Sequence, residues 1–146
     1  AAACDRARAA PVEDLIASWR DGALKLRLLQ AGLELRHGAP DLFGAGDYLP
    51  LTVEGPAANH AVAFARKAGD RAVVVVAPRL CLKLLEGEAM PLVPAARWRE
   101  TSVRLPKPVA GRPLRDILSG ERRSGETLAL AETLGTVPVA VLSNLA

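Results

Sequence analysis

The stretch "HAVAFARKAGDRAVVVVAP", residues 60–78, gives the strongest local structural signal in this sequence of 146 residues. Alanines alternate with larger residues in its first half, and valines run without interruption from Val73 to Val76 in its second half. Between the halves stands "AGD", a short glycine-containing segment typical of a tight turn. We therefore predict an antiparallel hairpin. Because Val73–Val76 would be apolar on both faces, the second strand should lie inside a sheet and be covered on both sides.

The segments on either side of this hairpin extend the strand pattern. Upstream, "DYLPLTVEG" predicts a strand near a sheet edge, where Pro50 is tolerated although it has no N–H to donate. Downstream come four weaker candidates separated by turn residues: "TSVRLP", "LRDIL", "ETLAL" and "PVAVL". Short strands at such spacing favour an antiparallel β-sandwich or Greek key over βαβ units. We expect a mainly β fold, with an all-β domain over residues 44–146.

Residues 1–43 predict a helical arm in front of the β domain. Pro11 suits the start of one helix, and Asp21 reads as the N-cap of a second helix from about Gly22 to Arg36. Gly38 and Pro40 would end it. The alanine-rich opening, residues 1–10, is expected to be frayed.

The second helix carries an unusually broad apolar stripe. Its centre is formed by Leu24, Leu28, Ala31 and Leu35, and it is widened by Leu26, Leu29 and Leu33. A stripe of this breadth requires cover on more than one side. The sequence therefore predicts that some of it meets a second surface.

Composition argues against several classes of protein. The net charge of +3 comes from 19 basic and 16 acidic residues without a block of like charge. Only five aromatic residues are present, so stacking on nucleic-acid bases is not favoured. No apolar run approaches the roughly 20 residues that cross a bilayer, and no signal peptide is evident. We expect a cytoplasmic protein without a nucleic-acid or membrane partner.

A metal or cofactor site is not indicated. His37, His60, Cys4 and Cys81 could in principle supply four zinc ligands, but no two of them form a close pair in the sequence. The chain has no Walker loop and no dinucleotide fingerprint. We predict no metal and no cofactor, and from the two unlike cysteines a reducing environment.

Catalytic residues are not indicated either. Glu86 and Glu88 flank a glycine and should face water, while Asp47, Asp70 and Asp116 look like strand-end or turn residues. No serine stands in a G-x-S-x-G elbow. An exposed indole can be a platform for a sugar ring, which makes Trp98 the single sugar-contact candidate; a position in the core is favoured for it. We assign no catalytic residue.

A resemblance covers most of the chain, from about Leu15 to Leu142. "WRDG" at 19–22, "KL" at 25–26 and "LFGAGDYLPL" at 42–51 resemble a block of the malto-oligosyltrehalose synthase family, in the alpha-amylase clan. "HAVAFARKAGDRAVVVVAPRL", "WRETSVRLP", "LRDILSGE" and "PVAVL" follow in the order of that family. The resemblance is to the C-terminal region, where the last helix of a catalytic (β/α)8 barrel runs into an all-β domain.

The resemblance implies a function for a larger protein. Such an enzyme rearranges the reducing-end α-1,4 linkage of a malto-oligosaccharide into an α,α-1,1 trehalose linkage. Its nucleophile and acid/base lie on barrel strands, so no residue of this chain inherits a catalytic role. The chain is expected to be a domain that stabilises the barrel and is inactive alone. Leu24, Leu28 and Leu35, which would have faced the barrel, are expected to pack on the β domain or on a second copy.

Two other functions stay open from the sequence. A free-standing starch- or malto-oligosaccharide-binding β module would need an exposed aromatic pair. A small autonomous enzyme would need to turn over malto-oligosaccharide by itself. The expected partners are accordingly the barrel, a malto-oligosaccharide, or a second copy of the chain bound through the apolar helix face.

Overall fold

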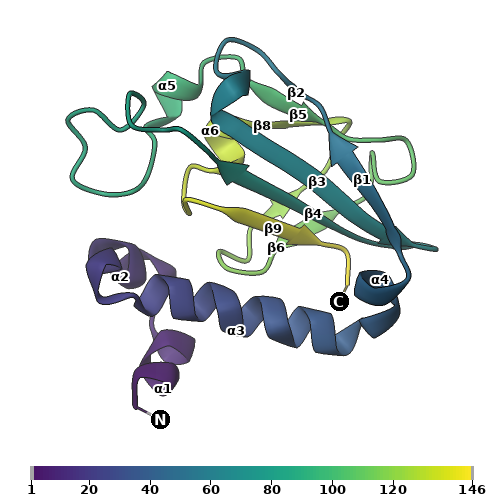
Figure 1. The fold of residues 1–146 in the computed structure, drawn as a ribbon, viewed down its shortest axis with the longest axis horizontal. Coiled ribbons are helices and arrows are strands. Elements are labelled where there is room, and N and C mark those ends of the chain that lie inside the picture. The colour runs from purple at the N-terminus through teal and green to yellow at the C-terminus, as the bar shows by residue number, and fades with distance from the viewer. Residues whose placement is uncertain (1, 146) are drawn as a thin grey trace.

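The computed structural model describes residues 2–145, which form two antiparallel sheets with a group of helices on one side (Figure 1). The helices are α1 (Ala2–Ala9), α2 (Val12–Ala17), η1 (Trp19–Asp21), α3 (Ala23–Gly38), α4 (Pro40–Gly44), η2 (Ala58–His60), α5 (Ala95–Trp98) and α6 (Leu130–Thr133). The strands are β1 (Asp47–Leu51), β2 (Val53–Glu54), β3 (Ala61–Ala68), β4 (Arg71–Pro78), β5 (Ser102–Arg104), β6 (Leu114–Asp116), β7 (Arg122–Arg123), β8 (Thr127–Ala129) and β9 (Ala140–Ser143). No helix within this range is long and apolar enough to cross a membrane.

The predicted hairpin is present and organises the larger sheet. Strands β3 and β4 pair antiparallel with Ala68 opposite Arg71, so Gly69 and Asp70 form the turn. Gly69 has a φ of 58°, in the left-handed region where glycine is favoured. The sheet order is β1-β3-β4-β9-β6-β7. The interior position of β4 and the edge position of β1, which contains Pro50, are therefore confirmed.

The core lies between this sheet and a three-stranded sheet of order β2-β5-β8. Val74 and Val76 of β4 share one buried cluster with Val103 of β5 and Leu128 of β8. Alternate residues of each strand thus point inward, as in a sandwich of two sheets. The prediction of a mainly β, antiparallel fold preceded by helices is confirmed.

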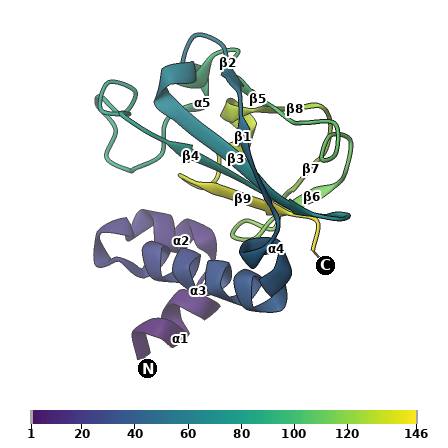
Figure 2. The same cartoon turned by 45° about the vertical axis from the view of Figure 1, so that its right-hand side comes forward.

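The outer face of the six-stranded sheet is partly covered by helices. Val73 of β4 is 1% exposed because it packs against Ala39 and Leu42 at the α3–α4 joint. Farther along α3, Leu24 lies in a cluster with Leu118 and Val137. Figure 2 shows α3 passing beneath the sheet from this second angle as well.

The expectation that the centre of the helical stripe packs on the β domain is confirmed. Leu24 and Leu28 belong to the cluster with Leu118, and Leu35 packs on the cluster around Val73. The stripe is not used in full, because Leu29 and Leu33 remain exposed.

The expectation that residues 1–10 are frayed is wrong for the described part. Helix α1 packs on α3 with Ala7 fully buried. Arg6 pairs with Asp21 at 3.0 Å and Arg8 pairs with Glu34 at 2.7 Å. These partners are remote in the sequence, so tertiary contacts supply what local propensity does not.

The start of α3 differs in detail from the prediction. Gly22, with a φ of 80°, takes the N-cap position expected for Asp21. The Asp21 carboxylate nevertheless accepts a hydrogen bond from the Ala23 N–H at 2.8 Å, which lowers the pKa of Asp21.

Beyond the C-terminal end of α3, Pro40 begins helix α4, which the sequence did not predict. The division into units 1–43 and 44–146 stays a prediction.

Candidate functional site

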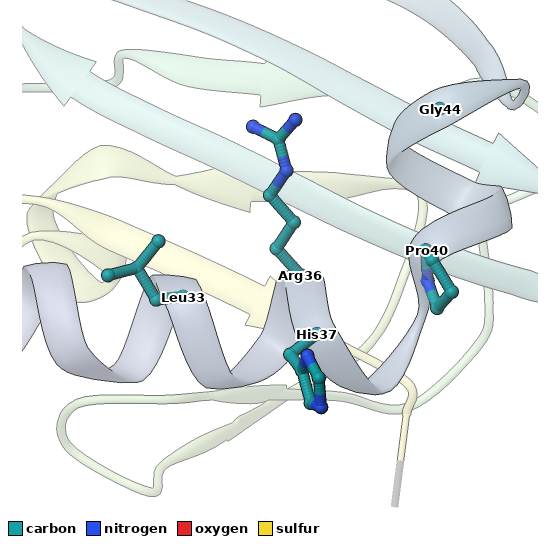
Figure 3. A pocket seen from close by; sticks show the side chains of 5 residues that line it. All are labelled: Leu33, Arg36, His37, Pro40 and Gly44. Atoms are coloured by element: carbon teal, nitrogen blue, oxygen red, sulfur yellow. The ribbon is translucent and has the colours of Figure 1, made fainter.

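An open pocket of about 610 Å³ lies at the joint between α3 and α4 (Figure 3). It is lined by Leu33, Arg36, His37, Pro40 and Gly44. In Figure 3 the side chains of Leu33 and Arg36 rise from one side of α3, whereas His37 points the opposite way. The pocket thus has an apolar wall with a guanidinium beside it.

The joint that forms this pocket is fixed to the sheet. Leu42 of α4 is fully buried, and Ala39 between the two helices is 1% exposed. The Arg66 side chain of β3 donates a hydrogen bond of 2.7 Å to the carbonyl of Phe43. The angle between α3 and α4 is therefore set by buried contacts and a charged hydrogen bond.

The pocket lining suits binding more than reaction. Its five residues carry no carboxylate, thiol or hydroxyl group. His37 lies in the last turn of α3, as predicted. No carboxylate or nucleophile from the lining stands with it, so the arrangement supplies a surface and not a catalytic pair.

Exposed apolar side chains flank this joint. Leu29 is 52% exposed and Leu33 is 64% exposed; because they lie one turn apart on α3, we refer to them as the α3 outer face. On the outer face of the sheet, Tyr48 is 56% exposed and stacks on Phe64, with ring centroids 5.2 Å apart. Apolar groups are thus left open on the α3 outer face, which reaches the pocket at Leu33, and on the sheet.

Trp98 lies in the core, the position that the sequence favoured. Its side chain is fully buried, and it packs in the same cluster as Val74 and Leu128. Its indole N–H is one of the buried polar groups without a hydrogen-bond partner. Since a sugar platform requires an exposed ring face, this structure offers none at Trp98.

The four zinc-ligand candidates are not brought together. Cys81 lies beside His60, with its sulfur 3.5 Å from the His60 carbonyl, while Cys4 lies in α1 and His37 at the end of α3. No three His, Cys, Asp or Glu side chains between residues 2 and 145 are grouped so as to hold a metal.

The two thiols should differ in reactivity. Partial burial raises the pKa of the Cys81 thiol, and its sulfur lies 3.1 Å from the Arg79 carbonyl, whereas Cys4 is exposed. Because the thiolate is the reactive form, we expect iodoacetamide at pH 7.5 to alkylate Cys4 several-fold faster than Cys81. Peptide mass spectrometry over time measures both rates, and in urea the difference should vanish. Equal rates in the folded chain would contradict this placement of Cys81.

The carboxylates singled out from the sequence are structural or exposed. Asp70 lies in the β3–β4 turn and pairs with Arg112 at 3.0 Å. Asp116 is 3% exposed and accepts hydrogen bonds from the backbone of the turn that follows β6. Glu86 and Glu88 are exposed, as predicted.

Comparison with known proteins points to one kind of enzyme. No family model matches the chain. Two proteins from strains of Mycobacterium tuberculosis, each named "Putative maltooligosyl trehalose synthase", are 36% identical to it over 118 residues. The match covers 81% of this chain and 13% of each relative.

A solved structure supports the same relationship. A mutant of maltooligosyltrehalose synthase from Arthrobacter ramosus matches with a TM-score of 0.61 and 29% sequence identity. The match covers 90% of this chain and 16% of that chain. The chain is therefore homologous to a region of maltooligosyl trehalose synthase and spans a small part of the length of such enzymes.

Sequence reasoning missed the residues of the pocket. It treated Leu33 as an extension of the buried stripe, and it gave Arg36 and Pro40 no role beyond the end of a helix. The resemblance to "LFGAGDYLPL" did mark the joint as a boundary. The hollow itself depends on the angle between α3 and α4, which no local pattern encodes.

Proposed function

We propose that this chain acts as the non-catalytic C-terminal domain of an enzyme like maltooligosyl trehalose synthase. In this role it stabilises a catalytic (β/α)8 barrel that converts the reducing-end α-1,4 linkage of a malto-oligosaccharide into an α,α-1,1 linkage. The observation that carries the proposal is the homology over 118 residues, which is 13% of the relatives' length. The absence of a catalytic pair from the α3–α4 pocket is consistent with it.

The α3 outer face is the surface that we assign to the barrel. The sequence suggested Leu24, Leu28 and Leu35 for this contact, but those residues are used inside the chain. Leu29 and Leu33 are free to make it, and they lie next to the pocket at the α3–α4 joint. Fully burying a leucine contributes about 1.5–3 kcal/mol, so the pair can supply a useful part of a domain interface.

A domain exchange tests this assignment. The matching region of the Arthrobacter ramosus enzyme is replaced by this chain, and conversion of maltopentaose into a non-reducing product is expected to persist. Replacing both Leu29 and Leu33 by aspartate should then lower the melting temperature of the fused enzyme by several degrees. In the isolated chain the same double variant should shift unfolding by no more than about 0.5 kcal/mol per site, since both side chains already face solvent.

The control is Leu82→Asp, at a loop position that is 86% exposed. It should leave both the fused enzyme and the isolated chain unchanged. If the double variant also left the fused enzyme unchanged, the α3 outer face would not be the contact. Conversion of maltopentaose by the isolated chain would overturn the non-catalytic role itself. Sedimentation of the isolated chain shows whether the same face joins two copies.

One observation favours a second candidate, a free-standing malto-oligosaccharide-binding module. Tyr48 is 56% exposed and stacked on Phe64, which gives one open ring face on the sheet. Such a ring can stack on a sugar. Retardation of the chain in an amylose-containing native gel, lost in Tyr48→Ala, would support this module. Equal mobility with and without amylose would leave the domain role as the better explanation.

A further inference from the structure

Arg115 of β6 and Arg122 of β7 lack the ion-pair partners that two neighbouring arginines have. Arg112 pairs with Asp70 at 3.0 Å, and Arg123 pairs with Glu121 at 2.5 Å. Arg115 of β6 and Arg122 of β7 are exposed, and neither forms an ion pair with the residues between 2 and 145. Two guanidinium groups are thus left uncompensated in one place.

The strand register makes this arrangement unfavourable on its own. Arg115 stands directly opposite Arg122 in the antiparallel β6–β7 pair. Like charges at directly opposed positions destabilise a sheet. An anion lying between the two side chains would remove that repulsion.

Two hollows share Arg115 of this pair. The first, of about 320 Å³, includes Arg27 of α3, and the second, of about 400 Å³, includes Arg122 and Asn144. Arg115, Ser143 and Leu145 line both. Arg115 and Arg27 therefore line the first hollow, and Arg115 and Arg122 line the second. Arg27 also donates to the Arg8 carbonyl, and the Ser143 hydroxyl and Asn144 amide beside them are hydrogen-bonded to backbone groups.

The backbone at Gly120 leaves room for the guanidinium of Arg115. Gly120 has a φ of 75°, and a Cβ built there would stand 3.3 Å from Nη2 of Arg115. Because Gly120 has no side chain, the Arg115 head lies close to the turn backbone at the rim of the hollow. A larger residue there would push the guanidinium away.

The one carboxylate in the lining is already engaged. Oδ1 of Asp116 accepts hydrogen bonds from the N–H groups of Leu118 and Ser119, and Oδ2 accepts from the Val141 N–H. It offsets part of the positive charge but offers its oxygens to the backbone and not to the arginines. Three cationic groups against one carboxylate leave a surplus that matches a dianion.

We propose that this region is an oxyanion site for a phosphate dianion, free or as a monoester, held between Arg115 and Arg122. A guanidinium presents a planar fork of N–H groups that binds phosphate oxygens in pairs, and a tetrahedral dianion can accept from two forks at once. Arg27 lines the neighbouring hollow, in which we place the substituent of a monoester. The proposal is independent of the function proposed above.

Binding of inorganic phosphate at constant ionic strength tests the site. In the wild-type chain we expect saturable binding in NMR titration and a rise in melting temperature. Arg115→Gln and Arg122→Gln should each weaken binding about tenfold or more, because each removes a charged hydrogen-bonding group. The matched control is the double variant Arg79→Gln/Lys83→Gln, which removes two charges at an exposed loop and should bind like wild type.

The melting temperature, measured with and without phosphate, distinguishes loss of phosphate binding from a change in folding. Without phosphate, Arg122→Gln should melt higher than wild type, since the opposed charge is gone, and phosphate should no longer raise its melting temperature. A hexose monophosphate that binds tighter than phosphate would identify the monoester as the preferred form; equal affinity would identify the free anion. Absence of saturable binding, or equal binding by wild type and Arg115→Gln/Arg122→Gln, would overturn the site.

Discussion

Asp116→Ala is expected to lower the free energy of unfolding by about 3–5 kcal/mol. The carboxylate is 3% exposed and accepts four hydrogen bonds. An alanine would leave buried N–H groups without a partner, and each such group costs about 1–3 kcal/mol.

The effect should be large because Asp116 joins two strands. Its Oδ1 accepts from Leu118 and Ser119 at 2.9 and 2.8 Å, which shapes the turn leading into β7. Its Oδ2 accepts from the Val141 N–H at 3.0 Å, which ties that turn to β9. Loss of the carboxylate therefore weakens both the turn and its attachment to the sheet.

Urea unfolding followed by circular dichroism measures the change. The matched control is Asp70→Ala, since Asp70 is also a turn aspartate but its side chain is 94% exposed. Its surface pair with Arg112 contributes at most about 1 kcal/mol. Asp116→Asn should lose less stability than Asp116→Ala and more than Asp70→Ala. Its amide oxygen still accepts hydrogen bonds, but its NH2 group would face backbone N–H donors. Equal losses for the two alanine variants would contradict the role assigned to Asp116.

The parts of the fold that were predictable are those with a local signal. The glycine-containing turn and the valine run specify the β3–β4 hairpin, and Pro50 specifies an edge. Strand β7 has two residues, Arg122 and Arg123, and its pairing depends on the turn that Asp116 holds. A segment of that length has no periodicity to recognise.

The exposed residues were harder to predict from the sequence, because tertiary packing decides which residues of an apolar stripe are covered. Leu33 and Leu35 are both leucines of one helix, but Leu35 meets the sheet and Leu33 does not. The opposition of Arg115 and Arg122 likewise follows from strand register. Helix α1 was missed for the same reason, since its ion pairs reach Asp21 and Glu34.

Gly46→Ala is expected to destabilise the chain by about 3 kcal/mol, at the upper end of what overpacking usually costs. A Cβ at this position would stand 2.4 Å from the Leu42 carbonyl oxygen and 2.8 Å from that of Lys67. Both are backbone atoms, in α4 and in β3, so neither can move aside as a side chain would. The Gly46 N–H also donates to the Asp41 carbonyl at 2.9 Å, which closes α4 onto β1.

Gly44→Ala is the matched control, because a Cβ at Gly44 meets nothing within 4 Å. Gly44 is the last residue of α4, where alanine should be neutral or stabilising by up to about 1 kcal/mol. Thermal and urea unfolding of the isolated chain compare the two. Similar stability of both variants would contradict the close approach at Gly46. Because this contact lies within the chain, Gly46→Ala should weaken both the isolated chain and the fused enzyme. The double variant Leu29→Asp/Leu33→Asp should weaken mainly the fused enzyme. This contrast separates the stability of the α3–α4 joint from the contact of α3 with a barrel.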